Sequence, residues 1–209
     1  MTEWDKILLE KEYSPEEPDG IVIDFTYRQG NNKIRVLDLA CGGGRHVVYM
    51  ARKGLEVTGT DISGTGLKMT RERLNKENLT AGLVRSAMNA LPFVDSTFEA
   101  VICTRAIHHQ KLRGIQQTLL EIKRVLSEDG MILIDFLSRR TYSHGKGIEI
   151  ENETFMETEG HEKGVIHHFT NEEELQELFE GFAILTIDLH EMKADGKLRS
   201  RLAVRALKH

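Results

Sequence analysis

The stretch VLDLACGGGRH, residues 36–46, decides how this chain folds. It begins as an apolar, mostly branched run, which is typical of a buried strand, and it continues into three consecutive glycines. Residues 47–53 then predict a short helix that Gly54 ends. Glycine permits positive φ and lets a ligand approach the backbone, and the start of a helix offers unpaired N–H groups. Strand, glycine turn and helix start together favour a ligand site in an α/β protein.

A plain βα turn could carry the same glycines, and the residue after the next strand argues against it. Residues 55–60 predict that strand, and Asp61 follows it directly. An acidic side chain at the tip of the second strand is placed to accept hydrogen bonds from both hydroxyls of a ribose. The sequence therefore predicts a ligand that contains a nucleoside.

The segments VLDLACGGGRH and GLEVTGTDIS (residues 54–63) resemble the nucleotide-binding half of class I S-adenosylmethionine-dependent methyltransferases. Three later segments match landmarks of that family in the expected order: LPF at 91–93, FEAVIC at 98–103, and EIKRVL at 121–126 followed by Gly130. The Gly-Arg-His sequence after the glycines is similar to the small-molecule, tellurite-resistance-type branch. The resemblance is strong over roughly residues 33–137 and looser elsewhere.

The resemblance implies an α/β, doubly wound, Rossmann-like fold with a seven-stranded, mostly parallel sheet. The implied strand order is 3-2-1-4-5-7-6, with strand 7 antiparallel. The residue pattern itself predicts helices at 21–28, 63–78, 111–127 and 170–180, the last with Thr170 as N-cap and Glu173 completing a capping box. It also predicts a short helix before residue 20, a turn at 30–33, and strands at 83–85, 98–104, 131–137, 183–189 and 200–208.

We expect one domain over residues 1–209, with an N-terminal arm at 1–30 and a substrate-side insertion at 138–170. The insertion shows little periodicity, and long irregular connections often serve as lids or binding loops. A net charge of −5 argues against non-specific nucleic-acid binding, which needs a basic surface. No apolar run is long enough to span a membrane, and no signal peptide is recognisable. The two cysteines form no disulfide framework, so a cytoplasmic location is expected.

The resemblance implies S-adenosylmethionine as cofactor. The residues expected to bind it are Asp38, Ala40, Cys41, Gly42, Gly44, Asp61, Ile62, Ala87, Met88, Asn89, Thr104 and His109. Two of them depart from the family pattern. Ala40 replaces the first glycine of the loop, which is a conservative change if its φ is negative. Ala87 stands where the family usually has an acidic residue that accepts the adenine amine, while Met88 is suited to pack on the adenine face.

Methyl transfer is an in-line displacement at the methyl carbon, and a closed site that positions the acceptor can supply most of the catalysis. We therefore name no catalytic residue. His108, Tyr142 and His168 are the residues expected to contact the acceptor, a small molecule. No metal is expected, because the spacing of the histidines at 144, 161, 167 and 168 matches no common ligand pattern.

Two other functions remain open alongside a small-molecule methyltransferase. A nicotinamide-dependent oxidoreductase is the first, but its dinucleotide-binding loop has a third glycine three residues past the second, and Val47 stands at that position here. No residue in the sequence distinguishes a methyltransferase from a non-catalytic protein that binds S-adenosylmethionine. The acceptor, its reacting atom and the oligomeric state do not follow from the sequence.

Overall fold

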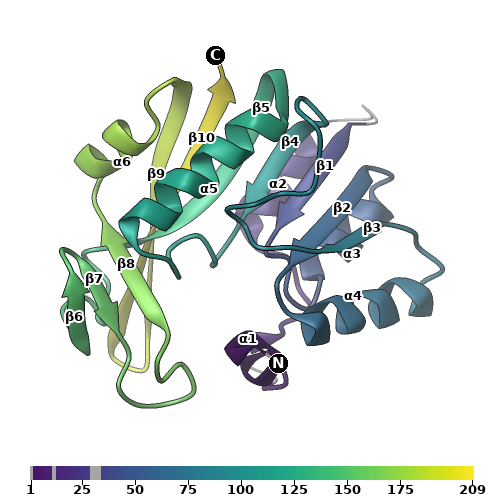
Figure 1. The fold of residues 1–209 in the computed structure, drawn as a ribbon. Helices are drawn as coiled ribbons and strands as arrows, with labels where there is room; N and C mark the ends of the chain where they lie inside the picture. The colour runs from purple at the N-terminus through teal and green to yellow at the C-terminus, as the bar shows by residue number, and fades with distance from the viewer. Residues whose placement is uncertain (1, 11–12, 29–33) are drawn as a thin grey trace.

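The computed structural model describes residues 2–10, 13–28 and 34–209. Five parallel strands form its centre: β1 (Arg35–Leu39), β2 (Glu56–Asp61), β3 (Gly82–Arg85), β4 (Phe98–Cys103) and β5 (Leu126–Ser138). β10 (Lys197–Lys208) pairs antiparallel with β5, and β9 (Phe182–Ala194) pairs antiparallel with β10 (Figure 1). The order β3-β2-β1-β4-β5-β10-β9 is the one that the resemblance implied.

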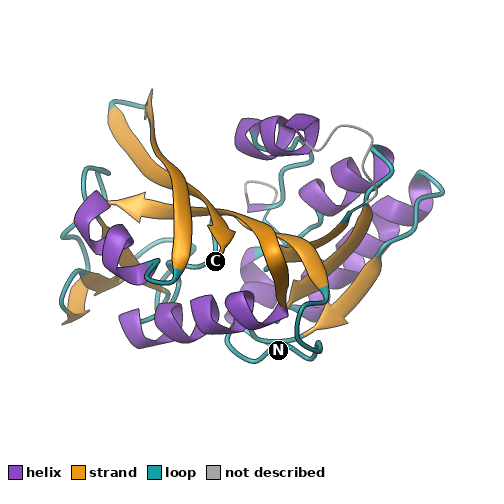
Figure 2. Ribbon diagram, turned by 90° about the horizontal axis from the view of Figure 1, so that it is seen from above, coloured by secondary structure: helices purple, strands orange, loops and turns teal. Residues whose placement is uncertain are grey.

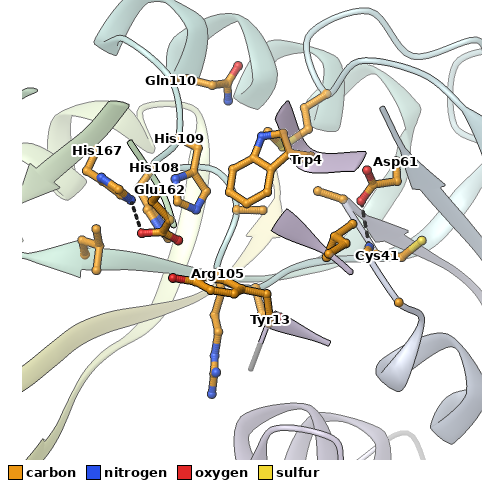
Figure 3. A pocket seen from close by; sticks show the side chains of 18 of the residues that line it. Trp4, Tyr13, Cys41, Asp61, Arg105, His108, His109, Gln110, Glu162 and His167 are labelled. Carbon is orange, nitrogen blue, oxygen red and sulfur yellow. Dashed lines mark hydrogen bonds and ion pairs between the residues drawn. The ribbon is translucent and has the colours of Figure 1, made fainter. Parts of the chain in front are cut away.

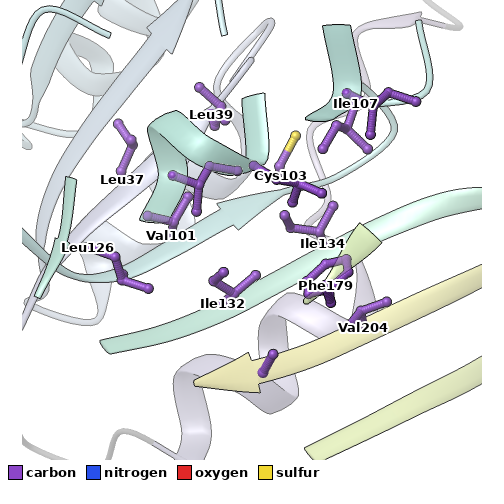
Figure 4. Packing of buried hydrophobic residues seen from close by; sticks show 14 of the residues in the cluster. Leu37, Leu39, Val101, Cys103, Ile107, Leu126, Ile132, Ile134, Phe179 and Val204 are labelled. Atoms are coloured by element: carbon purple, nitrogen blue, oxygen red, sulfur yellow. The ribbon is translucent and has the colours of Figure 1, made fainter. Parts of the chain in front are cut away.

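The period-two alternation along the central strands divides the buried residues into two cores, one on each face of the sheet. Leu37, Val101 and Ile132 belong to the core under α5 (Leu112–Val125) and α6 (Glu172–Leu178), which Figure 4 shows. Val36 and Ile102 belong to the opposite core. That second core packs against α2 (Gly20–Arg28), α3 (Arg45–Arg52) and α4 (Gly64–Lys76). Helices therefore cover both faces of the sheet, as Figure 2 shows from above.

Most of the predicted helices are confirmed. Of the two predicted N-caps, one is confirmed and one is wrong. Ser63 is the N-cap of α4, and its side chain accepts a hydrogen bond from the backbone N–H of Gly66. The N-cap of α6 is Asn171, so the assignment to Thr170 was wrong by one residue. Thr170 instead ends β8 (Ile166–Thr170), where it pairs with Ser138 of β5. Pairing in the sheet thus overrides the capping signal in the sequence.

The insertion at 138–170 is more regular than its sequence suggests, so the sheet has ten strands within the described residues, in place of the seven expected. β6 (Ile148–Glu151), β7 (Thr154–Met156) and β8 pair antiparallel in series. β8 also pairs in parallel with the end of β5, beyond the point where β4 stops. Strands of three to five residues are too short to produce a readable alternation, which is why the pattern predicted an irregular segment.

The described part of the N-terminal arm forms α1 (Glu3–Ile7) and α2, and the turn expected at 30–33 lies outside the described residues. α1 is fixed to the start of α4 through Asp5. The Asp5 carboxylate accepts hydrogen bonds from the Ser63 hydroxyl at 2.7 Å and from the Thr65 backbone N–H at 3.0 Å. Among the helices of the described residues, none has the length and apolar character needed to cross a membrane.

Candidate active site

A cavity of about 620 Å³ opens at the carboxyl ends of the central strands. This volume is within the range of small-molecule sites, and the carboxyl edge is where open α/β sheets bind ligands. Its walls come from the glycine loop, the N-terminal arm, the segment after β4 and the insertion. Figure 3 shows Asp61 and Cys41 at one end, a group of histidines with Glu162 at the other, and Trp4 between them. We call these the donor end and the acceptor end.

The glycine loop of the donor end, residues 40–44, is held in a strained and crowded conformation. Gly42 and Gly44 have φ of +53° and +79°, and a Cβ on Gly44 would lie 2.4 Å from Thr70. Ala40 has φ of +58°, so the condition under which its replacement of a glycine would be conservative is not met. Arg73 of α4 holds the loop by donating a hydrogen bond to the Gly43 carbonyl at 2.8 Å. The hydrogen bond from Arg73 and the close packing against Thr70 therefore restrict the backbone of the loop.

Asp61 connects the glycine loop to the start of α4. One carboxylate oxygen accepts a hydrogen bond from the Gly42 N–H at 2.8 Å, and the other accepts one from the Ser63 N–H at 2.7 Å. Each carboxylate oxygen can accept two hydrogen bonds, so both oxygens keep capacity for further donors such as a pair of ribose hydroxyls. Burial raises the pKa of Asp61 from its ordinary value. A pair of ligand hydroxyls would restore part of the hydration that this carboxylate has lost.

The cavity gathers nearly all the residues expected to bind a cofactor. It is lined by Ala40, Cys41, Gly42, Gly44, Asp61, Ile62, Ala87, Met88, Asn89, Thr104 and His109. Asp38 is the one that does not line it. Its carboxylate is buried in β1, one oxygen has no hydrogen-bond partner among the described residues, and burial raises its pKa to about 8. Its position fits a role in ordering the loop better than direct contact with a ligand.

Of the residues expected to contact the acceptor, His108 and Tyr142 line the cavity and His168 does not. The fully buried His168 ring lies 2.8 Å from the Thr154 hydroxyl and 3.2 Å from Glu174, so it ties β8 to β7 and α6. Its neighbour His167 lines the cavity instead. Successive side chains of a strand point to opposite faces, and this explains why only one histidine of the pair faces the cavity.

Four side chains from distant segments meet at the acceptor end: His108 and His109 after β4, Glu162 before β8, and His167 within β8 (Figure 3). The rings of His108 and His109 are 4.2 Å apart between centroids, and those of His109 and His167 are 4.7 Å apart. Burial lowers the pKa of His109 to about 3 and that of His108 well below its ordinary value. His108 and His109 are therefore neutral at physiological pH and can accept a hydrogen bond or bind a cation.

Two contacts of this site were not predicted. Trp4 of α1 lies over His109, with ring centroids 4.6 Å apart, and the prediction of an N-terminal arm near the cavity did not specify that contact. Glu162 lies in the aperiodic insertion among several other glutamates. Both residues reach the cavity through tertiary packing, which a local pattern does not reveal.

The Arg45-His46 pair, which carried part of the resemblance, stabilises the arm. Asp19, just before α2, forms ion pairs with Arg45 and Arg105. Its backbone N–H donates to His46 Nε2 at 3.1 Å, so His46 Nδ1 carries the proton and faces the Thr104 hydroxyl at 3.4 Å. Burial and the charge of Arg45 lower the pKa of His46 to about 3. The pair therefore fixes the arm beside the cavity and also lines the cavity wall.

Comparison with known proteins agrees with this geometry. A family model described as a methyltransferase domain matches residues 36–130. The putative methyltransferase YqeM of Bacillus subtilis (strain 168) is 33% identical over 105 residues, which are 49% of this chain and 42% of that protein. The chain spans less than half of the length of the first curated relatives that it matches.

Solved structures extend the likeness to nearly the whole chain. A SAM-dependent methyltransferase from Methanosarcina mazei superimposes with a TM-score of 0.77 at 20% identity, covering 92% of this chain and 98% of that one. TehB from Haemophilus influenzae superimposes with a TM-score of 0.72 at 18% identity, covering 100% of this chain and 68% of that one. The resemblance is confirmed at the level of the fold: residues 36–130 match a family model described as a methyltransferase domain, and the chain has the fold of the solved class I methyltransferases.

Proposed function

We propose that this protein transfers a methyl group from S-adenosylmethionine to a small polar acceptor. The observation that carries the proposal is the division of one cavity into two chemically different ends. The donor end has a rigid glycine loop and a buried carboxylate, and the acceptor end has a group of histidines with a glutamate. A methyltransferase needs two such neighbouring sites, one for each reactant.

The residues of the donor end fit an adenosyl cofactor. Asp61 has acceptor capacity left on both carboxylate oxygens for a ribose diol. Gly42 and Gly44 leave room where a side chain would otherwise stand, and Arg73 and Thr70 hold the loop in place. Met88 lies beside Ala87 and Asn89 on the wall, where it can pack against a base. The adenine amine would then bind a backbone carbonyl or Asn89, because Ala87 offers no carboxylate.

S-adenosylmethionine, when bound, supplies a methyl group on a positively charged sulfur. The chain itself positions the acceptor and excludes water. Trp4 covers the boundary between the two ends, and Asp5 holds its helix against α4. Tyr142 and the histidines of the acceptor end offer hydrogen-bonding groups to a polar acceptor, and a closed site with few competing waters strengthens each of those contacts.

Titration calorimetry with S-adenosylhomocysteine, the demethylated product, tests the proposal. We expect saturable binding to the full chain and at least tenfold weaker binding to Asp61→Ala, because each charged hydrogen bond contributes roughly 1.5–3 kcal/mol. Asp24→Ala is the matched control, since Asp24 is an exposed carboxylate on α2 that does not line the cavity. Equal affinities for the wild-type chain and Asp61→Ala would place the cofactor elsewhere.

Labelled S-adenosylmethionine incubated with fractionated small-molecule extracts tests the transfer itself. Label should move into an extract component with the wild-type chain and not with Asp61→Ala. Binding of S-adenosylhomocysteine without transfer to any fraction would support a non-catalytic binding protein instead.

A further inference from the structure

We propose that His109, Glu162 and His167 form a binding site for a divalent transition-metal ion at the acceptor end of the cavity. Each residue offers one ligand atom, and the three atoms lie within 4.8 Å of one another. They come from the segment after β4, the loop before β8, and β8 itself (Figure 3). The sequence predicted no metal from the spacing of the histidines at 144, 161, 167 and 168, and that interpretation did not include His109, which lies far in sequence from Glu162 and His167.

The chemistry of the three residues suits a transition metal. Imidazole and carboxylate together bind zinc, iron and nickel, and two histidines with one glutamate are a known catalytic zinc set. His167 Nε2 and Glu162 Oε2 are already 3.3 Å apart, close to the separation of about 3.4 Å expected for two ligands of a tetrahedral zinc ion. The Glu162 side chain is 26% exposed, so it can rotate to close the wider separations within the group.

The surroundings of the second ring nitrogen of His167 are also those expected for a histidine that binds a metal. A histidine that binds a metal through one nitrogen normally directs its other N–H at a carboxylate or carbonyl. The Nδ1 atom of His167 is buried, has no hydrogen-bond partner among the described residues, and lies 4.0 Å from Glu157 Oε1. With Nε2 on a metal, Nδ1 would carry the proton and face that carboxylate. A small movement of Glu157 would then complete the hydrogen bond.

The open side of the site faces the space reserved for the acceptor, since all three residues line the cavity. Three protein ligands leave at least one coordination position free, as in catalytic zinc sites. This part of the inference rests on the proposed methyltransferase function. An acceptor hydroxyl or thiol that binds the free position would ionise more readily and release its proton to solvent. The methyl step then forms the new O–C or S–C bond and breaks the S–CH₃ bond, whose electron pair stays on the sulfur of S-adenosylhomocysteine.

Cobalt(II) titration of the tag-free full chain, after treatment with a chelator, tests the site without any need for the acceptor. We expect one equivalent to bind with visible absorption bands, and zinc(II) to displace it. Glu162→Gln and His167→Ala should each weaken cobalt binding at least tenfold. His144→Ala is the matched control, because His144 lies in the same insertion and pairs with Glu153 at 2.6 Å but does not line the cavity. It should bind cobalt as the wild-type chain does.

S-adenosylhomocysteine affinity, measured on the same variants, shows whether each is folded and separates the two proposals. Three results would overturn the metal site even where S-adenosylhomocysteine still binds. The first is that the wild-type chain takes up no cobalt, the second is that Glu162→Gln and His167→Ala bind it as the wild-type chain does, and the third is that His144→Ala loses it equally. Stoichiometric cobalt uptake by a chain that binds no S-adenosylhomocysteine would keep the metal site and overturn the proposed function. Glu162→Gln keeps the test decisive if His167→Ala fails to fold, since Glu162 lies in a loop.

Discussion

The two ends of the cavity are built in different ways. At the donor end, the glycine loop follows β1, Asp61 ends β2, and Ala87 and Met88 follow β3, so strands consecutive in the sequence present their carboxyl ends side by side. At the acceptor end, α1, the segment after β4 and the insertion meet although they are far apart in the sequence. A site at consecutive strand ends can be inferred from strand order. A site assembled from distant segments requires the tertiary structure.

The largest effect that we predict concerns the rigidity of the donor end. Gly44→Ala should lower the free energy of unfolding by about 2–4 kcal/mol, because it adds a left-handed alanine and forces a Cβ to within 2.4 Å of Thr70. Urea denaturation measures this loss. S-adenosylhomocysteine binding should weaken as well, since the loop must shift to relieve the clash.

Gly54→Ala separates the two causes. Gly54 has φ of +80°, nearly the value of Gly44, and a Cβ there would meet nothing within 4 Å. Only the conformational cost of about 1 kcal/mol should appear. A loss as large as that of Gly44→Ala would show that φ alone explains the effect, and that Thr70 does not restrict the loop.

The sequence predicted the donor end and the central sheet well because both depend on local signals. Each of these features can be recognised from the residues next to it in the sequence: the glycines of residues 42–44, the apolar strands and Asp61. The acceptor end was predicted only in part. Tyr142 and His108 were placed at the cavity, but the choice of His168 depended on the phase of a five-residue strand, which the sequence does not reveal. That residues 1–209 form one domain, and the roles of individual site residues, stay predictions.

A smaller effect distinguishes the two faces of β8. His168→Ala should lower the free energy of unfolding by about 1–3 kcal/mol, because it removes a fully buried ring together with its contacts to the Thr154 hydroxyl and to Glu174. His167→Ala should lower it by less than about 1 kcal/mol, because His167 faces the cavity and can be replaced there by water. Urea denaturation of the two variants in metal-free buffer compares them directly.

Both β8 variants should bind S-adenosylhomocysteine within threefold of the wild-type chain, a difference of about 0.7 kcal/mol. The comparison of the two ends is contradicted if His167→Ala proves the more destabilising variant. It is equally contradicted if either substitution removes cofactor binding while the chain remains folded, since the donor end would then depend on the insertion.

A crystal structure of the full chain with S-adenosylhomocysteine tests the central claim, that one cavity joins a donor end to an acceptor end, most directly. We predict that both ribose hydroxyls lie within about 3 Å of the Asp61 carboxylate and that the sulfur atom faces the side of the cavity lined by His109, Glu162 and His167. An adenosyl group bound away from Asp61, or a sulfur atom directed away from these three residues, would contradict it.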